Sequence, residues 1–308
     1  MKTDVSAIVT IPPYAPFIEE VLRHPVVSGL RLNTVMPLKG TFEENLQRLY
    51  DTANSQDKDL WIDLKCRQLR VKNFGVPPFT EIELTHQISV DTPVTAYFSD
   101  GREQATVLQV DGNRLIMQEG PKRVIGPGES VNIMHPSLSI EGFFTGTDVQ
   151  YIEAAKKIGM HKYMLSFVEQ VSDVEELLKL DSQAEIVEKI ESEKGLNYVC
   201  NEWNQKSELK GKTHLMAARG DLYVELSKPH YIIRAIEDIV KADPKAIVAS
   251  RIFSSLGQGL EPSCADIGDV SNLLRMGYKN LMLGDEVCQR RESVISALNL
   301  LYAMVRKG

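Results

Sequence analysis

The sequence predicts an α/β fold, a (β/α)8 TIM barrel with a small all-β domain inserted after the third barrel strand. Three observations support this prediction. Outside residues 71–140, eight strand-like runs are each followed by a helix-like segment, and together they fill roughly 240 residues, the size of such a barrel. Within residues 71–140 the helical periodicity disappears and short alternating runs replace it. Polar side chains also gather where five of the eight strands end, the rim at which such barrels carry their active sites.

The first three barrel strands are separated by two helices. The expected strands are Ser6 to Ile11, Gly29 to Val35 and Asp59 to Lys65, and the expected helices are Ala15 to Arg23 and Thr41 to Ala53. Thr41 and Glu44 have the spacing of a capping box, in which each side chain accepts a hydrogen bond from the backbone N–H of the other residue. Strands joined through helices run parallel, because the helix returns the chain to the same end of the sheet.

Residues 71–140 are expected to form a small β-barrel domain. Its alternating runs are Glu81 to Leu84, Val94 to Phe98, Ala105 to Val110, Arg114 to Gln118 and Ser130 to Met134. The Asp111-Gly112 pair lies between two of these runs and favours the tight turn of a β-hairpin. The predicted domains are therefore a barrel of residues 1–70 and 141–308 and an inserted domain of residues 71–140.

The second half of the chain supplies the other five barrel strands. They are expected at Tyr163 to Val168, Glu185 to Glu191, Thr213 to Arg219, Ala246 to Phe253 and Asn280 to Glu286. The helices expected around them are Thr147 to Ile158, Asp173 to Leu180, Pro229 to Lys241, Cys264 to Met276 and Arg291 to Arg306.

The stretch from residue 185 to residue 225 carries the most informative side chains. Lys189 and Glu191 lie two residues apart at the end of a strand, so both point to the same face. An ammonium and a carboxylate are costly to bury unless something binds there. Gly220 allows close approach of the backbone before a segment that could begin a helix, and Asp221 adds a second carboxylate. Two hard oxygen donors with one lysine suit a Mg²⁺-bound acid that is phosphorylated or forms an enolate.

The composition is that of a globular protein and argues against several classes. Hydrophobic residues make up 43% of the chain, charged residues 25%, and the net charge is −7. No basic stripe is present, so we expect no nucleic-acid partner. No apolar run is long enough for a signal peptide or a membrane span, which predicts a cytoplasmic protein without membrane contact. The four cysteines form no CxxC pair, which predicts reduced, packed cysteines and no structural zinc.

These segments resemble the pyruvate kinase family over nearly the whole chain. Lys189-Ile190-Glu191 is similar to the end of one strand of that family, and Ala218-Arg219-Gly220-Asp221 is similar to its Ala-Arg-Gly-Asp segment. Similar segments elsewhere are Thr10-Ile11-Pro12-Pro13, Arg31-Leu32-Asn33, Asp63-Leu64-Lys65 with Arg70, Pro262-Ser263-Cys264-Ala265-Asp266, and Leu281-Met282-Leu283 with Glu286. The insert lies where the family carries a mobile lid domain. An Arg-Gly-Asp tripeptide alone is common, so its value comes from its order and spacing relative to the lysine-glutamate strand.

The resemblance implies a metal site and a catalytic lysine. Glu191 and Asp221 would hold Mg²⁺ or Mn²⁺, which bridges the protein and the oxygens of the substrate. Lys189 would neutralise charge that develops on the transferred phosphoryl group or on the enolate. The backbone N–H groups around Gly220 and Asp221 would bind the carboxylate of the substrate.

The resemblance implies further roles at the other strand ends. Arg31 would assist at the phosphoryl group, and Arg70 would lie towards the nucleotide. Ser250 takes the place of a threonine that is associated with protonation of the enolate, and it keeps the hydroxyl. Asn33 and Asp63 match a possible site for a monovalent cation such as K⁺.

Several positions depart from the family pattern. Val35 stands where a serine helps to bind the monovalent cation, and Arg251 stands where a glutamine is usual. Asp285 replaces a glycine beside the glutamate of the eighth strand. Leu64 and Cys66 alter the third strand.

Three functions remain open at this point. The first is a pyruvate kinase-like transfer of phosphate between phosphoenolpyruvate and a nucleoside diphosphate such as ADP, through a Mg²⁺-bound pyruvate enolate. The second is another metal-dependent pyruvate or enolate reaction on the same barrel, as in an aldolase, a decarboxylase or transfer to another acceptor. The third is a non-catalytic binding or regulatory relative.

Two further expectations concern assembly and control. The sequence ends after the eighth helix, so we expect no C-terminal regulatory domain and no control by a sugar phosphate bound there. The partners expected are small-molecule substrates, with a homo-oligomer as the default because barrel faces often pair.

Overall fold

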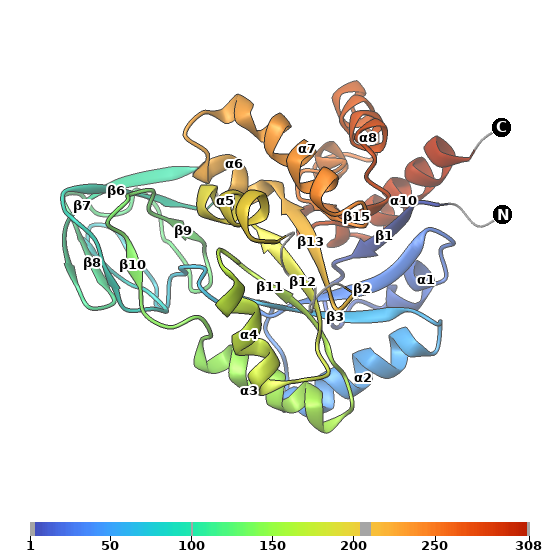
Figure 1. Cartoon of the computed structure of the whole chain (residues 1–308), viewed down its shortest axis with the longest axis horizontal. Helices are drawn as coiled ribbons and strands as arrows, with labels where there is room; N and C mark the ends of the chain where they lie inside the picture. The colour runs from blue at the N-terminus through green and yellow to red at the C-terminus, as the bar shows by residue number, and fades with distance from the viewer. Residues whose placement is uncertain (1–3, 100, 204–210, 307–308) are drawn as a thin grey trace.

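The computed structural model describes residues 4–99, 101–203 and 211–306. Eight parallel strands close a barrel in the order β1-β15-β14-β13-β12-β11-β3-β2 (Figure 1). These strands are β1 (Ser6–Val9), β2 (Val27–Asn33), β3 (Asp59–Leu64), β11 (Lys162–Leu165), β12 (Glu185–Ile190), β13 (Thr213–Ala218), β14 (Ile247–Ala249) and β15 (Asn280–Leu283). The predicted barrel is confirmed. The segment between β12 and β13 includes residues 204–210, which lie outside the described residues.

Helices cover the outside of the barrel (Figure 1). They are α1 (Ile18–Leu22), α2 (Phe42–Asn54), α3 (Gly146–Lys157), α4 (Val171–Leu180), α5 (Glu193–Asn201), α6 (Arg219–Glu225), α7 (Ile232–Ala242), α8 (Cys264–Met276), α9 (Asp285–Cys288) and α10 (Arg291–Val305). The predicted capping box of Thr41 and Glu44 is present at the start of α2. None of the described helices has the length and apolar character needed to cross a bilayer.

The insert follows β3 and is all-β, as predicted, and it extends to the left in Figure 1. Its described strands form two antiparallel sheets and not the closed β-barrel expected from the sequence. Its main sheet has the order β4-β8-β7-β6-β9, and a second, two-stranded sheet pairs β10 with β5. The strands are β4 (Glu81–Glu83), β5 (Ile88–Ser89), β6 (Val94–Phe98), β7 (Glu103–Asp111), β8 (Arg114–Met117), β9 (Val131–Asn132) and β10 (Ser139–Ile140). Asp111 pairs with Arg114 across the predicted hairpin, and Gly112 has the positive φ of +60° that the turn requires.

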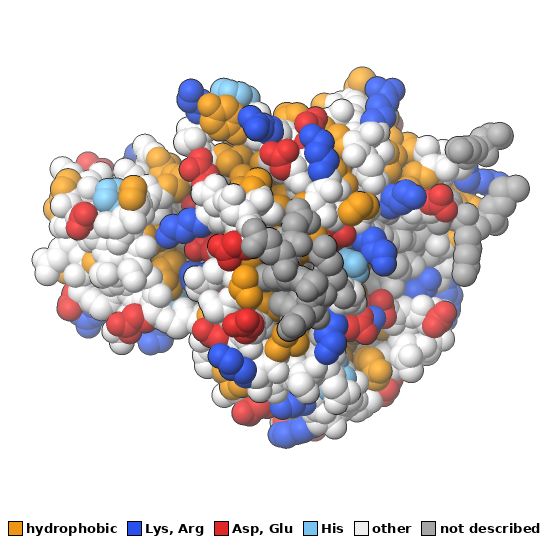
Figure 2. All heavy atoms as spheres, viewed as in Figure 1, with side chains coloured by type: hydrophobic (Ala, Val, Ile, Leu, Met, Phe, Trp, Pro, Cys, Tyr) orange, Lys and Arg blue, Asp and Glu red, His pale blue; other side chains and the backbone are white. Residues whose placement is uncertain are grey.

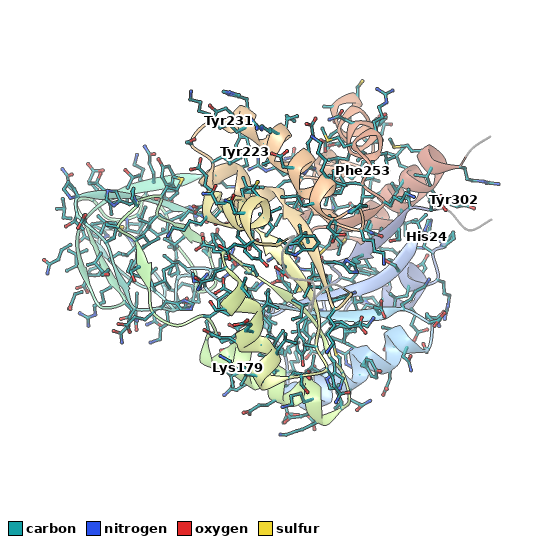
Figure 3. The ribbon with its side chains drawn as sticks, in the orientation of Figure 1. His24, Lys179, Tyr223, Tyr231, Phe253 and Tyr302 are labelled. Atoms are coloured by element: carbon teal, nitrogen blue, oxygen red, sulfur yellow. The ribbon has the colours of Figure 1, made fainter. Side chains whose placement is uncertain are left out.

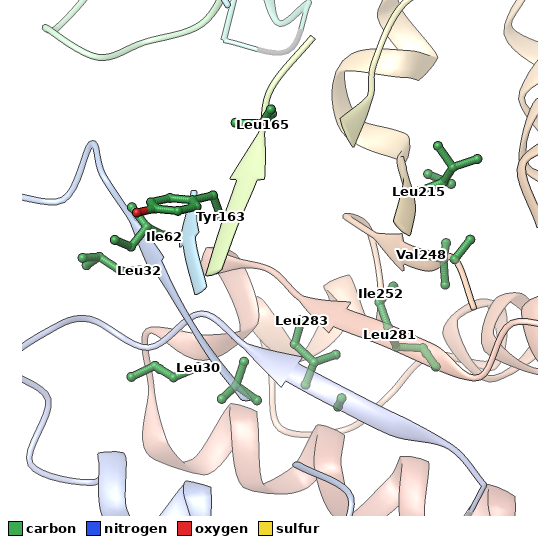
Figure 4. Packing of buried hydrophobic residues seen from close by; sticks show 14 of the residues in the cluster. Leu30, Leu32, Ile62, Tyr163, Leu165, Leu215, Val248, Ile252, Leu281 and Leu283 are labelled. Atoms are coloured by element: carbon green, nitrogen blue, oxygen red, sulfur yellow. The ribbon is translucent and has the colours of Figure 1, made fainter. Parts of the chain in front are cut away.

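The barrel and the insert have separate hydrophobic cores. Most of the barrel core packs between strands and helices, and Figure 4 shows part of it, including Leu30, Tyr163 and Leu281. A smaller cluster of alternate residues lines another face of the strands: Ile8, Met164, Val187, Met216, Ala218, Ile247, Ala249 and Met282. The core of the insert draws its buried residues only from the segment between Leu69 and Ile133. Two units with separate apolar cores can move relative to each other without exposing either core.

Several barrel strands end earlier than predicted. The strand expected to reach Phe253 ends at Ala249, because Ser250, Arg251 and Phe253 have φ values of +70°, +57° and +54°. Such left-handed backbone cannot continue a strand. The chain also turns at Asp285, where α9 begins, so the last strand ends at Leu283. These sharp turns bring polar groups to the C-terminal rim.

Alternation along β12 sets which side chains face the barrel interior. Lys189 and Glu191 share one face, while Glu188 lies on the opposite face towards α5. There the buried Glu188 carboxylate accepts a hydrogen bond of 2.6 Å from the hydroxyl of Tyr198. All four cysteines are free; Cys66 and Cys288 are buried, but Cys200 and Cys264 are exposed, so the packing prediction is wrong for those two.

Candidate active site

Asp63 is the centre of a buried charge cluster at the end of β3. Its carboxylate accepts hydrogen bonds from Arg31 Nε at 2.8 Å, Lys65 Nζ at 3.1 Å and Lys189 Nζ at 3.1 Å. Burial alone would raise the pKa of Asp63, but the three cations outweigh burial and hold this pKa well below its usual value. The carboxylate therefore stays ionised and fixes the position of all three basic side chains.

Lys189 joins this cluster to the predicted metal ligands. Its Nζ lies 2.8 Å from Ser166 Oγ and 3.2 Å from Glu191 Oε1. Burial acts to lower the pKa of Lys189, but the carboxylates of Asp63 and Glu191, with Asp221, raise it above its usual value. Lys189 thus remains a cation that is paired with Asp63 and Glu191.

Lys65 responds differently to the same surroundings. Burial lowers its pKa to about 7, and although Asp63 opposes this shift, the positive charges of Arg70, Lys189 and Arg31 add to it. Lys65 therefore changes its charge near neutral pH.

Different donors hydrogen-bond to the carboxylates of Glu191 and Asp221, which follow the neighbouring strands β12 and β13. Glu191 Oε2 accepts a hydrogen bond of 2.9 Å from the backbone N–H of Phe167. Asp221 Oδ2 accepts from Gln68 Nε2 at 2.8 Å, and Oδ1 accepts from Asn132 Nδ2 at 3.2 Å. Glu191 Oε1 lies 3.2 Å from Lys189 Nζ, and the negative charge of Asp221 also acts to raise the pKa of Lys189.

The donor set fits a Mg²⁺ ion that takes part of its coordination from substrate. Mg²⁺ is usually held by one or two carboxylates and keeps oxygen ligands from water or substrate. Glu191 and Asp221 provide two such carboxylates at 3% and 9% exposure. Within the described ranges, no group of three or more His, Cys, Asp or Glu side chains could hold a metal ion by itself.

Gly220, in the first turn of α6, and Ser250, directly after β14, lie against each other. A Cβ atom at position 220 would come within 3.3 Å of Ser250 Oγ, so glycine gives this hydroxyl room. Arg219 fixes the turn, since its Nη2 donates to the carbonyl of Ser250 at 2.9 Å and its guanidinium pairs with Asp269 at 2.8 Å. Arg251 stacks 4.3 Å from the ring centre of Tyr223, which is labelled in Figure 3.

The remaining predicted residues lie on two sides of the charge cluster. Asn33 is paired in register with Asp63, and its Nδ2 donates to Asp285 Oδ2 at 3.0 Å. Asp285 Oδ2 is also 3.8 Å from Arg31 Nη1, so Arg31 faces a second acid. Arg70 is not in the cluster; it lies in the connection to the insert and donates from Nε to Gln68 Oε1 at 2.9 Å.

Sequence reasoning missed several side chains that hold this site. Ser166, Gln68 and Asn132 each contact a predicted residue but lie outside any recognised pattern. Asp148 had a detectable signal, since Thr145 and Asp148 have capping-box spacing. Besides capping α3, Asp148 accepts hydrogen bonds from the backbone N–H groups of Lys65 at 2.8 Å and Cys66 at 3.0 Å.

Comparisons with known proteins agree with this architecture. The family model for "Pyruvate kinase, barrel domain" matches residues 78–292. The chain is 26% identical to a pyruvate kinase of Borreliella burgdorferi over 216 residues, covering 68% of this chain and 44% of that protein. It is also 26% identical to a pyruvate kinase of Thermoplasma acidophilum over 314 residues, covering 93% of this chain and 54% of that protein. The chain thus spans about half the length of these curated relatives.

A solved structure shows the same fold. The crystal structure of Cryptosporidium parvum pyruvate kinase superimposes with a TM-score of 0.76 at 19% identity, covering 97% of this chain and 70% of that chain. The family model covers more than half of the sequence, and its barrel is the architecture that the strand order shows. The chain therefore belongs to the pyruvate kinase family.

Proposed function

We propose that this chain is a pyruvate kinase-like phosphotransferase that moves phosphate between phosphoenolpyruvate and ADP. The observation that carries the proposal is the position of Lys189, whose buried ammonium lies 3.2 Å from Glu191 while Asp63 holds it in place and the charge of Asp221 acts to raise its pKa. A scaffold without ligands gains nothing from such a costly arrangement of charges. Because catalysis of phosphoryl transfer is mainly positioning and charge neutralisation, this arrangement suits that reaction.

Each residue has a role in the proposed reaction. Glu191 and Asp221 would hold Mg²⁺ or Mn²⁺, which when bound would neutralise negative charge on substrate oxygens. Lys189 stabilises negative charge on the phosphoryl group as its bond to the enol oxygen breaks. The backbone N–H groups at Gly220 and Asp221 orient the substrate carboxylate. Ser250 lies beside them, where its hydroxyl can pass a proton to the carbon of the enolate.

The other predicted residues serve the phosphoryl and nucleotide side of the proposed site. Arg31 neutralises the phosphoryl group, and Arg70 meets the nucleotide from the connection to the insert. A monovalent cation bound by Asn33 and Asp63 would compete with Arg31 and lysine side chains for the Asp63 carboxylate. The assay of phosphoryl transfer between phosphoenolpyruvate and ADP is therefore run both with and without K⁺.

One observation favours a second candidate function. Asp285 places a carboxylate oxygen 3.8 Å from Arg31 Nη1 and accepts a hydrogen bond from Asn33. This second acid reduces the positive charge that Arg31 offers to a dianionic phosphoryl group. An enolate-forming reaction of pyruvate without phosphoryl transfer, as in an aldolase or a decarboxylase, would tolerate that loss better.

A coupled assay with phosphoenolpyruvate, ADP and Mg²⁺ tests the first proposal, with formation of pyruvate as the expected result. Exchange of pyruvate protons without phosphoryl transfer would instead support the second candidate. Oxalate mimics the enolate of pyruvate. Failure of oxalate to bind in the presence of Mn²⁺ would contradict both.

We further propose that residues 71–140 form a lid domain on a barrel of residues 1–70 and 141–308. The separate hydrophobic cores support this division. We expect deletion of residues 71–140 to leave a folded barrel with a cooperative thermal transition and little turnover, because the site loses the cover that excludes water. Turnover equal to that of the full chain would show that the insert serves another purpose.

A further inference from the structure

Two paired segments of the chain, together called the connection, lie where the insert meets the barrel. The first segment, residues 66–71, leads from the barrel into the insert. The second segment, residues 129–134, belongs to the insert and contains β9, and the chain returns to the barrel only after β10. The backbone N–H of Val71 donates to the carbonyl of Glu129 at 3.0 Å, and the N–H of Val131 donates to the carbonyl of Leu69 at 2.9 Å. These backbone hydrogen bonds hold the two segments of the connection together as one two-stranded unit.

Each segment places one side-chain amide on the carboxylate of Asp221. Gln68 of the first segment donates to Oδ2 at 2.8 Å, and Asn132 of the second segment donates to Oδ1 at 3.2 Å. Both amides are buried, at 3% and 2% exposure. Both oxygens of an acid on the barrel are thus held by residues of the connection to the insert.

Asn132 also holds a second acid on the same helix. Its Nδ2 donates to Glu225 Oε1 at 2.8 Å, and Asp221 and Glu225 lie one turn apart on α6. Like charges at this spacing repel, and a shared amide donor reduces the repulsion. Asn132 Oδ1 is buried and makes no hydrogen bond with the described protein atoms. The side-chain hydrogen bonds of Asn132 are therefore those to the two acids.

We propose that Asn132 and Gln68 are positioning residues that couple the orientation of the insert to the Asp221 carboxylate. A rotation of the connection must move or break these two hydrogen bonds, and a ligand that fixes Asp221 must restrain the connection. The part of this proposal that concerns metal binding rests on the proposed function, in which Asp221 holds the divalent ion. Coupling of this kind is reciprocal: the factor by which the amides strengthen metal binding is the factor by which metal stabilises the orientation of the insert.

The first test compares Asn132→Ala with Asn113→Ala in the full chain. Asn113 is the matched control, because it is an asparagine of the insert whose Nδ2 donates to Glu83 at 3.1 Å and to the carbonyl of Leu84 at 2.9 Å. Groups that hydrogen-bond to a metal ligand change metal affinity by roughly 10- to 100-fold when removed. We expect the Kd for Mn²⁺, measured by electron paramagnetic resonance, to rise by that factor in Asn132→Ala and to stay within about twofold in Asn113→Ala.

Hydrogen exchange separates coupling from a merely structural role. Mn²⁺ is expected to slow amide exchange of residues 129–134 in the wild type and to slow it far less in Asn132→Ala. If Asn132→Ala instead loosens the connection equally with and without Mn²⁺ and leaves the Kd for Mn²⁺ unchanged, the proposal is overturned.

A metal-free measurement tests the coupling without relying on the proposed function. In metal-free buffer, Asp221→Asn removes the charge that the two amides bind, and we expect exchange of residues 129–134 to become roughly tenfold faster. Unchanged exchange would overturn the coupling whatever the metal does. If this acceleration occurs although the wild type binds no Mn²⁺, the metal assignment fails while the coupling stands.

Discussion

Lys189→Met is expected to lower the rate of phosphoryl transfer by about 10³-fold or more, because a positioned cation in such reactions contributes a factor of about 10³ to 10⁵. The substitution keeps a similar chain length and removes the ammonium that pairs with Glu191 and Asp63. Initial rates with saturating phosphoenolpyruvate, ADP and Mg²⁺ measure the effect. Circular dichroism confirms that the variant is folded under the same conditions.

Lys162→Met is the matched control for this prediction. Lys162 lies at the opposite end of a barrel strand and pairs with Asp59 at 2.9 Å and Glu185 at 3.0 Å, so it is also a salt-bridged lysine. We expect its activity to stay within about twofold of the wild type, since partly exposed ion pairs contribute little. Equal losses in the two variants would mean that Lys189 contributes only to folding, and the catalytic assignment would be wrong.

Asp63→Ala is expected to lower the free energy of unfolding by about 3–5 kcal/mol, the usual cost of removing one partner from a buried ion pair. Asp63 is fully buried and accepts hydrogen bonds from Arg31, Lys65 and Lys189, which the alanine would leave without their common acceptor. Urea unfolding followed by circular dichroism measures the loss. Asp63→Asn, which keeps the shape but not the charge, serves as a second variant if the alanine does not fold.

Asp59→Ala provides the comparison, because Asp59 is 46% exposed in its pair with Lys162. We expect that variant to lose no more than about 1 kcal/mol. A loss in Asp63→Ala as small as that in Asp59→Ala would show that the cluster does not depend on its central carboxylate.

The lowered pKa of Asp63 predicts how the free energy of unfolding changes with pH. The pKa of Asp63 in the folded chain lies below its usual value of 3.8, so the folded state binds this proton less readily than the unfolded state. The stability that Asp63 contributes is therefore fully present above pH 3.8 and is lost as the pH falls towards the folded pKa. Acid unfolding curves should be steeper below pH 4 for the wild type than for Asp63→Asn.

The barrel and much of its charge cluster could be predicted from local sequence patterns. Alternation of strands and helices determines that strand ends meet at one rim, so Lys189, Glu191 and Asp63 could be placed near one another from their positions alone. The strand ends themselves were harder to place. At Ser250 and Arg251 the backbone turns left-handed, which no periodicity of side chains reveals.

The supporting amides could not be predicted because they depend on distant parts of the chain. Asn132 reaches Asp221 across 89 residues of sequence, and Gln68 reaches it across 153. Such contacts follow from how the insert docks on the barrel, not from the residues that surround each amide. The sequence shows that Asp285 replaces a glycine of the family pattern, but only the structure shows that its carboxylate faces Arg31.

The carboxylate of Asp148 joins the two parts of the barrel that the insert separates in the sequence. It binds backbone N–H groups of Lys65 and Cys66, which precede the insert, and the N–H of Thr145, which follows it. These hydrogen bonds hold the end of the first barrel segment of the chain against the start of the second, whatever sequence lies between the two segments. An inserted domain of different length or sequence at this position would leave the eight-stranded barrel closed. The active site can therefore acquire a different lid domain while the barrel stays the same.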